Sequence, residues 1–293
     1  MNFSVVVPTY NRPEKLNNCL SSILSQEYRG EFEIIMVEDD ASEKSKPIID
    51  SLNQDGKIRY FSQNHKGPAV ARNFGVSKAI YDYIAFTDDD CVVPANWLSA
   101  IESGFKQYKN AGAVGGFMEA PTEVLKQNVF SRYESFMTRT VYGAGSKEIF
   151  GGFEVPTGGT NNIAYKKSVL SEIKGFDETF PVAAGEDADL KLRVVSKGYK
   201  ILYIPLKVEH FHLFGWKSFI RQSWIRGIGS YYFHQKHGGG LGLFGILGML
   251  FLLPLIFIND LRKGIPLQIA LLKKIACFFD FVSQLKWMMI PKK

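Results

Sequence analysis

The opening segment FSVVVPTYNRPEKLNNCLSSILSQEYRGEFEIIMVEDD, residues 3–40, decides the fold class. Residues 3–9 form a β-branched apolar run, residues 13–26 carry leucine and isoleucine at helical spacing, and residues 32–40 begin with a second apolar run. This order predicts a strand, a helix and a second strand parallel to the first.

The same alternation continues along the chain. It recurs in KIRYFSQN (residues 57–64), in a helical pattern near residues 69–80 and in YIAFTDDD (residues 83–90). We therefore predict an α/β fold with a mostly parallel sheet flanked by helices, and the nearly continuous apolar runs indicate strands buried on both faces. A second ordered block follows in residues 162–176 and 185–205, where a helix is expected to end at Gly198.

The intervening stretch, Ala111 to Thr157, is rich in glycine: AGAVGGF, YGAGSKEIFGGF. Glycine favours turns and loops, so we expect an irregular, mobile surface region near the site, in which Val129 to Val141 could form a helix.

The last third of the chain differs in charge and hydropathy. From Phe211 onward there are eleven Lys or Arg residues against two aspartates, whereas the chain as a whole has a net charge of +6, so the first 210 residues carry an excess of three negative charges. A nucleic-acid-binding protein would carry its positive charge on the recognition domain itself, so this charge distribution argues against nucleic acid as a partner. We predict two domains, a catalytic domain over residues 1–220 and a basic, apolar, membrane-associated helical tail over residues 221–293.

The tail contains two apolar segments. Residues 241–258 are uncharged and reach the lower limit for crossing a bilayer, but glycines and Pro254 interrupt them, and basic residues lie on both sides. Residues 265–290 mix apolar residues with lysines, as an interfacial helix does. A spanning segment, a re-entrant segment and an internally packed hairpin or oligomer contact all stay open.

Three scattered cysteines, Cys19, Cys91 and Cys277, exclude a paired disulfide framework and a C-x-x-C metal site, which favours a reducing compartment. The N-terminus lacks a basic lead before a long apolar stretch, so we expect no signal peptide. Together with the tail, this predicts a location at the cytoplasmic face of a membrane.

Acidic residues gather at the ends of two predicted strands, in VEDDAS (37–42) and FTDDDC (86–91), and at the start of a predicted helix, in GEDADL (185–190). Each could be a solvated turn or a helix start. Adjacent carboxylates also suit a hard divalent ion, Mg²⁺ or Mn²⁺, that is shared with phosphate oxygens. A carboxylate at the helix start could act as a general base.

The order of these motifs resembles glycosyltransferase family 2, whose members have the GT-A fold and use nucleotide-diphospho-sugars. The resemblance extends from Phe3 to His212. Five pieces carry it, in the order of the family: SVVVPTYNRPEKL, VEDDAS, GPAVARNFGVSKAIYDYIAFTDDD, GGTNNIAYKKSVLSEIKGFDETF and GEDADLKLRVVSKGYKILYIP followed by VEH.

The resemblance implies site residues position by position. The nucleotide pocket would comprise Pro8, Tyr10, Arg12, Asp40, Arg72, Asp88 and Asp89, with Asp40 holding the base and Asp88 near the ribose. The metal ligands would come from Asp88, Asp89 and Asp90, which occupy the D-x-D region of the family, together with His210, for which His212 is the alternative. Asp187 would be the catalytic base, with Glu186 beside it.

Two further segments are weaker matches. Arg221, Gln222, Trp224 and Arg226 resemble part of the Q-x-x-R-W segment of processive synthases, without its full spacing. Residues 158–162, GGTNN, could shape the acceptor side, although such turns are common.

The resemblance implies an inverting displacement at the anomeric carbon of a nucleotide sugar, most simply a UDP-sugar, although GDP and dTDP stay open. The acceptor would be a glycan or a lipid-linked saccharide of surface polysaccharide or glycolipid synthesis.

Two other functions use similar acidic groups. A nucleotidyl or phosphoryl transferase would usually carry a glycine-rich phosphate loop, and the first strand–helix junction reads PTYNRP instead. A receiver-like, non-enzymatic Mg²⁺-binding domain would be much shorter and would leave GEDADL unexplained.

Overall fold

The computed structural model describes residues 1–212 and 214–290. The chain forms two compact units. The first, the sheet unit, comprises residues 1–119, 138–178 and 187–212, and the second, the helical unit, comprises residues 120–137, 179–186 and the chain after residue 212. The domain division between residues 220 and 221 stays a prediction.

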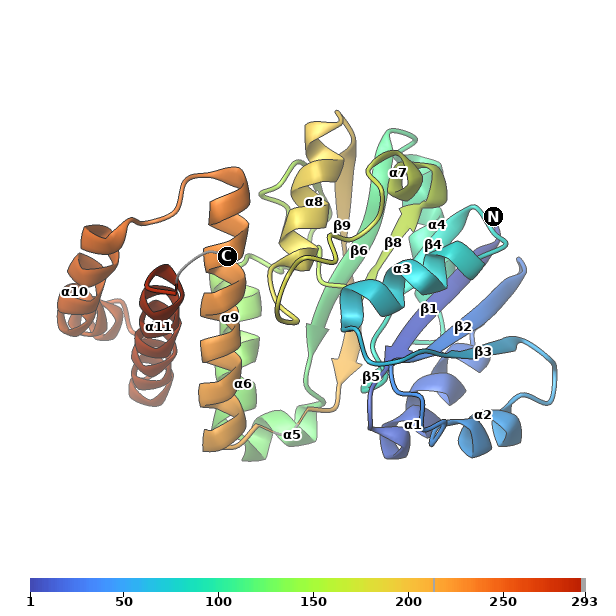
Figure 1. Cartoon of the computed structure of the whole chain (residues 1–293), viewed down its shortest axis with the longest axis horizontal. Helices are drawn as coiled ribbons and strands as arrows, with labels where there is room; N and C mark the ends of the chain where they lie inside the picture. The colour runs from blue at the N-terminus through green and yellow to red at the C-terminus, as the bar shows by residue number, and fades with distance from the viewer. Residues whose placement is uncertain (213, 291–293) are drawn as a thin grey trace. The chain divides into compact units, whose positions relative to one another are not determined.

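The sheet unit is built on one sheet with the strand order β3-β2-β1-β4-β8-β6-β9-β5, and β7 also pairs with β9 (Figure 1). Neighbours among β3, β2, β1 and β4 are parallel, as are β6 and β9, whereas β8, β5 and β7 run antiparallel to their partners. The predicted α/β fold is confirmed, with its parallel part at the N-terminal side. The strands are β1 Phe3–Thr9, β2 Phe32–Glu38, β3 Ile58–Ser62, β4 Tyr83–Phe86, β5 Cys91–Val92, β6 Ala111–Glu119, β7 Ile149–Gly151, β8 Ile163–Lys166 and β9 Lys200–His210.

Alternate residues of each strand enter one of two hydrophobic cores, because successive side chains of a strand point to opposite faces. Val5 and Val7 of β1 lie in the core that α1, α2 and α4 cover, whereas Val6 lies in the core covered by α3, α7 and α8. These helices are α1 Pro13–Leu24, α2 Lys46–Leu52, α3 Pro68–Lys78, α4 Trp97–Gln107, α7 Lys167–Glu172 and α8 Glu186–Ser196. Burial on both faces explains why the strands are apolar without alternation.

Strand β6 corrects the sequence analysis. An irregular region was expected from Ala111, but residues 111–119 form a largely buried strand between β8 and β9. Glycine is required here by close packing: a Cβ atom at Gly116 would collide with the carbonyl oxygen of Leu206. The helix that was expected between Val129 and Val141 is present as α6 Val129–Phe136, followed by the π-helical segment Met137–Val141.

Beside Gly116, the pairing of β6 with β9 shifts register, which leaves backbone carbonyls without ladder partners. The side chain of Asn162 compensates, since its Nδ2 donates to the carbonyl oxygens of Phe117 and Leu206 at 2.9 and 2.8 Å. Its Oδ1 accepts from Trp97 Nε1 at 2.9 Å. Asn162 is therefore a buried structural residue of the sheet.

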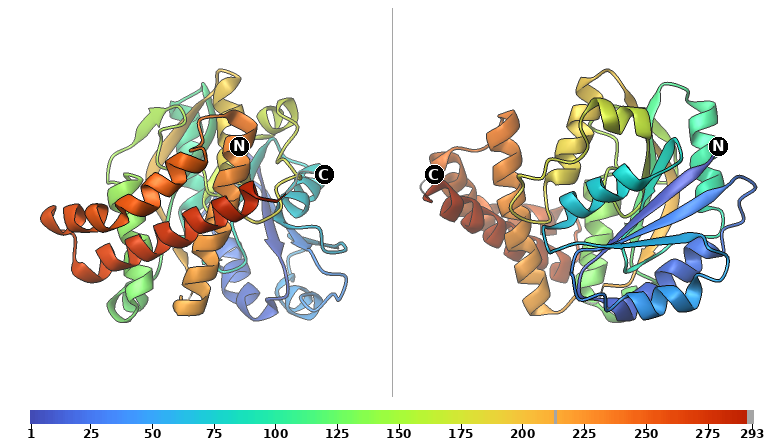
Figure 2. Two further views of the ribbon diagram at one scale, coloured as in Figure 1. Left: turned by 60° about the vertical axis from the view of Figure 1, so that its left-hand side comes forward. Right: turned by 45° about the vertical axis from the view of Figure 1, so that its right-hand side comes forward.

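The helical unit contains α5 Thr122–Gln127, α6, α9 Trp216–His237, α10 Leu243–Arg262 and α11 Leu267–Met288. Helices α10 and α11 run antiparallel side by side and are joined by a short turn (Figure 2). Within the described residues, α10 is the one helix long and apolar enough to cross a membrane. The predicted apolar helical tail is therefore present.

Candidate functional site

The candidate site lies where β1, β4 and β9 end at their carboxyl ends. In open α/β sheets, ligands bind beyond this edge. The turn after β4 carries Asp88, Asp89 and Asp90; Arg72 pairs with Asp88, and Arg12 pairs with both Asp89 and Asp90. The structure thus brings together residues that are far apart in the sequence.

Asp89 is fully buried and joins this turn to β1. Thr9 Oγ1 donates to Asp89 Oδ2 at 2.6 Å, and Arg12 Nη2 lies 2.7 Å from Asp89 Oδ1. Burial raises the pKa of Asp89 to about 7, against the opposing effects of the Arg12 charge and the Thr9 hydroxyl. Asp89 therefore holds the guanidinium group of Arg12 in place.

Asp90 is also buried, and an arginine, a lysine and two histidines surround it. Its Oδ2 lies 3.0 Å from Arg12 Nη1 and 3.2 Å from Lys15 Nζ, and its Oδ1 lies 3.2 Å from His210 Nε2. His212 is more distant, with Nδ1 3.9 Å from Asp90 Oδ2. Burial alone would raise the pKa of Asp90, but these histidines and Arg12 hold it well below its usual range.

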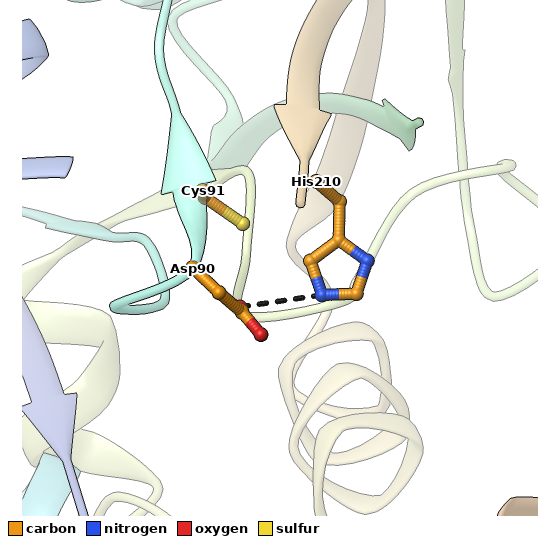
Figure 3. A group of neighbouring side chains, drawn as sticks. All are labelled: Asp90, Cys91 and His210. Atoms are coloured by element: carbon orange, nitrogen blue, oxygen red, sulfur yellow. Dashed lines mark ion pairs between the residues drawn. The ribbon is translucent and has the colours of Figure 1, made fainter. Parts of the chain in front are cut away.

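A possible ligand set for a cation includes Asp90 and His210. Figure 3 shows them with Cys91, and the ligand atoms of the three lie within 4.8 Å of one another. Cys91 and His210 are paired residues of β5 and β9, which explains how the set is held. Carboxylate oxygen and imidazole nitrogen suit Mn²⁺, so these residues fit a divalent cation. Burial raises the pKa of the Cys91 thiol, which keeps that group protonated.

Asp88 faces a different partner. Arg72 of α3 is almost fully buried, and its Nη2 lies 3.0 Å from Asp88 Oδ1. The Arg72 guanidinium also lies 5.8 Å from the ring centre of Phe176. Arg72 is therefore held in place on two sides, with its charge directed at the acidic turn.

The two aspartates after β2 differ. Asp39 is buried and accepts from Gln63 Nε2 and from the backbone N–H groups of Lys66 and Gly67 at 2.7 to 2.9 Å. Asp40 lies at the surface, where its Oδ1 accepts from Ser42 N at 3.0 Å, and that bond lowers its pKa. Asp39 thus holds the loop after β3, whereas Asp40 is partly exposed.

The loop held by Asp39 places an aromatic pair. The Tyr10 ring stacks on His65 with 4.1 Å between ring centres, and His65 Nδ1 lies 2.9 Å from Asp39 Oδ2. Tyr10 is 48% exposed, while Pro8 is buried in β1. Of the predicted nucleotide residues, Tyr10 is therefore the one that offers an open flat surface.

Asp187 stands in the first turn of α8, after the buried Glu186. The N–H and hydroxyl of Thr160 donate to Asp187 Oδ2 at 3.2 and 3.5 Å, whereas Oδ1 is shielded from solvent and makes no hydrogen bond within the described residues. Burial raises the pKa of Asp187, Arg72 acts against this, and Asp88 adds to it. Asp187 is therefore a carboxylate with few compensating contacts.

One turn further along α8, Lys191 contacts the segment that carries Thr160. Its Nζ donates to the carbonyl oxygen of Val155, and its stem fills the space beside Gly158. Burial lowers the pKa of Lys191 to about 8. The GGTNN motif therefore has internal roles at two positions, Thr160 against Asp187 and Asn162 in the sheet.

The segment that resembles part of a synthase motif lies on α9, in the helical unit. Arg226 forms a bidentate ion pair with Glu134 of α6, at 3.0 and 2.8 Å. Lys286 Nζ lies 5.5 Å from the ring centre of Trp224. These contacts join the helices of that unit to one another.

Five residues that contact the candidate site residues were not predicted from the sequence: Thr9, Lys15, Asp39, Thr160 and Lys191. Thr9 and Lys15 meet the acidic turn across more than 70 positions of chain. Two of these residues could have been found from their positions in the sequence. Thr9 is the last residue of the predicted first strand, and Thr160 belongs to the GGTNN motif.

Comparisons with known proteins agree with this architecture. The family model described as "Glycosyl transferase family 2" matches residues 4–174. The "Pre-mycofactocin glycosyltransferase" of Mycobacterium tuberculosis is 28% identical over 211 residues, which are 71% of this chain and 42% of that protein. This chain spans between 12% and 42% of the length of eight curated relatives, that protein among them.

Two solved structures share the fold. The mannosyltransferase PcManGT from Pyrobaculum calidifontis, in complex with GDP-Man and Mn²⁺, has a TM-score of 0.63 at 16% identity and covers 98% of this chain and 88% of its own. GalNAc-T7 with UDP, GalNAc and Mn²⁺ has a TM-score of 0.57 at 14% identity and covers 83% of this chain and 52% of its own.

Proposed function

The chain belongs to glycosyl transferase family 2, and on that premise we propose that it moves a sugar from a nucleotide-diphospho-sugar to an acceptor hydroxyl with inversion at the anomeric carbon. Family membership decides in favour of sugar transfer over phosphoryl transfer and over a receiver-like domain. The observation that carries the proposed mechanism is the contrast between Asp90, which lies within 3.2 Å of Arg12, Lys15 and His210, and the sparsely compensated Asp187.

The donor nucleotide would lie over the carboxyl ends of β1 and β4. Tyr10 offers an exposed ring on which a base can stack, and Asp40 offers a carboxylate oxygen to its polar edge. Arg12 is 40% exposed, so it can turn from the aspartates toward a diphosphate. Pro8, Arg72, Asp88 and Asp89 complete the proposed pocket, with Asp88 directed to the ribose.

A divalent cation, Mn²⁺ or Mg²⁺, would be held by Asp90 and His210, with Asp88 and Asp89 as the other proposed contributors. When bound, the cation would offset the negative charge of the departing nucleoside diphosphate. Arg12 and Lys15 add positive charge beside Asp90. Both named structural neighbours were solved with Mn²⁺, which supports Mn²⁺ as the first ion to test.

Asp187 would be the general base that takes the proton of the acceptor hydroxyl. Thr160 fixes Oδ2, so Oδ1 is the oxygen with a free lone pair for that proton. The raised pKa fits a base, because a carboxylate that binds a proton more readily removes one more readily. Glu186 would support the turn from which Asp187 projects.

We propose a UDP-sugar as donor and a glycan or lipid-linked saccharide as acceptor, in cell-surface polysaccharide or glycolipid synthesis. One of the two structural neighbours was solved with UDP and the other with GDP-Man, so both nucleotides belong in a screen. The apolar, basic tail supports a membrane surface as a further partner, and we propose that the protein lies at the cytoplasmic face of that membrane. Residues 1–220 would form the catalytic domain and residues 221–293 the tail.

The test is a screen of nucleotide sugars for binding to the full chain by calorimetry, with Mn²⁺, with Mg²⁺ and with EDTA. We expect one nucleotide class to bind only in the presence of a divalent ion, and Asp90→Ala to lose that binding. Binding that persists in EDTA, or an Asp90→Ala variant that binds as the unchanged chain does, would contradict the proposed metal site.

A further inference from the structure

Helix α10 exposes an apolar half. Its exposed large side chains cover one side of the helix without a charge among them, and Phe244 and Phe251 are 86% and 83% exposed. An uncharged surface of this extent is unusual on a protein that water surrounds completely. The exposed set is Leu243, Phe244, Leu247, Phe251, Leu252, Leu255, Ile258 and Leu261.

The other side of α10 is a narrow seam against α11. The buried residues Ile246, Leu253 and Asp260 recur every seven positions, which is the spacing of a helix that packs along its length on one partner. Asp260 Oδ1 accepts from Lys273 Nζ of α11 at 2.9 Å. Helix α10 is therefore held lengthwise on α11.

Helix α11 is in turn anchored to α9. At their crossing, Gly227 of α9 leaves no space for a Cβ atom, because Ser283 and the carbonyl of Asp280 occupy it. Ser283 is fully buried there. Such close contact between small residues fixes the position of α11 within the helical unit.

Helix α11 also carries charged residues along its length: Lys273, Lys274, Asp280 and Lys286. A helix with charge distributed in this way cannot cross the hydrocarbon core at acceptable cost. Its exposed apolar residues Leu267, Leu271 and Phe278 nevertheless follow one another at helical spacing on the side away from the buried Leu272, Ala276 and Ser283.

We propose that α10 and α11 form a hairpin that lies in the plane of a lipid bilayer, with the apolar half of α10 and the apolar stripe of α11 in one leaflet and neither helix crossing it. This rests on the proposed membrane partner and specifies how the partner is bound. Helix α10 is about 30 Å long, enough to span the hydrocarbon core. Because α11 is packed along α10, a spanning α10 would also bring the charged residues of α11 into the hydrocarbon core.

Charge supports the same occupant. Basic residues stand at both ends of α10, Lys236 before it and Arg262 and Lys263 after it, and Lys274 lies on α11 over Phe257. Lysine and arginine beside an apolar surface favour anionic headgroups.

The decisive test locates the two ends of α10 in membrane vesicles. Gly239→Cys and Lys263→Cys are made singly in a chain carrying Cys277→Ala, because Cys19 and Cys91 are buried, and vesicles of both orientations are treated with a membrane-impermeant maleimide. We expect both positions to react in the same vesicle orientation. Reaction of the two positions in opposite orientations would show that α10 crosses, and would overturn the proposal.

Flotation with liposomes tests the occupant. The unchanged chain should float with anionic liposomes, Phe251→Glu should lose most of that binding, and the matched control Ile80→Glu, an exposed apolar residue of the sheet unit, should keep it. A chain that stays unbound and elutes as a dimer, which Phe251→Glu converts to a monomer, would identify a second copy as the occupant and would overturn the proposal. Neither assay depends on sugar transfer, so failure of the proposed enzymatic function would be recognised separately.

Discussion

The acidic turn after β4 and the acidic start of α8 use the same side chain in two electrostatic settings. In the turn, Asp88, Asp89 and Asp90 each face arginine, lysine or histidine within 3.2 Å. At α8, Asp187 has Thr160 for its second oxygen and no hydrogen bond to its first within the described residues.

The pKa directions follow the difference between Asp90 and Asp187. Hydrogen bonds from His210 and His212 and the charge of Arg12 hold the pKa of Asp90 down in spite of burial, whereas burial prevails at Asp187 and raises its pKa. A carboxylate of the first kind stays charged and binds cations, and one of the second kind accepts protons. Asp89, with a pKa near 7, shows that one arginine does not fully offset burial.

The largest expected effect is that of Asp187→Asn. Removal of the base should lower kcat by about 10²- to 10⁴-fold and leave donor binding unchanged, because the amide keeps the shape and the contact with the Thr160 N–H. Transfer assays and calorimetry on the same preparation measure both quantities. Asp55→Asn, at the surface of the sheet unit, is the matched control. Loss of donor binding would instead place Asp187 in the donor pocket.

Next is the metal site. Asp90→Asn should weaken Mn²⁺ binding by about 100-fold and His210→Ala by about 10-fold, since each removes a ligand atom from one set. Electron paramagnetic resonance of free Mn²⁺ during a titration gives the affinity without an activity assay. An unchanged affinity in both variants would remove the metal role from this turn and leave it as an anion-binding site built on Arg12 and Lys15.

A smaller effect concerns pH. Because the pKa of Asp187 is raised, activity should fall on the acid side at a higher pH than an ordinary aspartate would give. The Thr160 hydroxyl lowers that pKa, so Thr160→Val should move the acid limb upward by less than about one unit, with the backbone bond remaining. Thr160→Ser should restore the profile. If activity falls at the same acid pH in Thr160→Val and in Thr160→Ser, the hydroxyl has no effect on the pKa of the base.

The smallest effect is on stability. Lys191 binds its proton less tightly in the folded chain, with a pKa near 8 against 10.5 when unfolded, so the unfolded state holds more protons between those values and the free energy of unfolding rises with pH there. Buried Cys19 and Cys91, whose thiol pKa values are raised, have the opposite effect over the same range, so the contribution of Lys191 is measured against the Lys191→Met variant. The change in the free energy of unfolding between pH 8 and pH 10, from chemical denaturation, should be more positive by roughly 2 kcal/mol in the unchanged chain than in Lys191→Met. An equal change in the two proteins would show that Lys191 makes no such contribution.

Hydrophobic periodicity was enough to predict the parallel half of the sheet, because β1, α1 and β2 bury residues at the spacing that their geometry requires. It failed at β6. A strand that must approach Asn162 and Leu206 closely uses glycine, and glycine in a sequence also predicts a loop.

The candidate site was predictable in its acidic residues and less so in their partners. The sequence pattern places three aspartates at the end of a predicted strand. The hydrogen bond between Thr9 and Asp89, however, depends on the register of β1 and β4, which sequence spacing does not encode. Similarly, VEDDAS gives no sign that Asp39 turns inward and Asp40 outward. The roles of Asp40, Asp187 and His210 stay predictions until they are tested.

The side-chain amide of Asn162 makes the sheet sensitive to deamidation, the slow hydrolysis of asparagine to aspartate. Its two N–H bonds point at the carbonyl oxygens of Phe117 and Leu206, so hydrolysis of this amide to aspartate would set a buried carboxylate against two acceptors. Chemical ageing at this single position would therefore loosen the middle of the sheet, and the tightly packed interior that surrounds Asn162 is also what shields it from water.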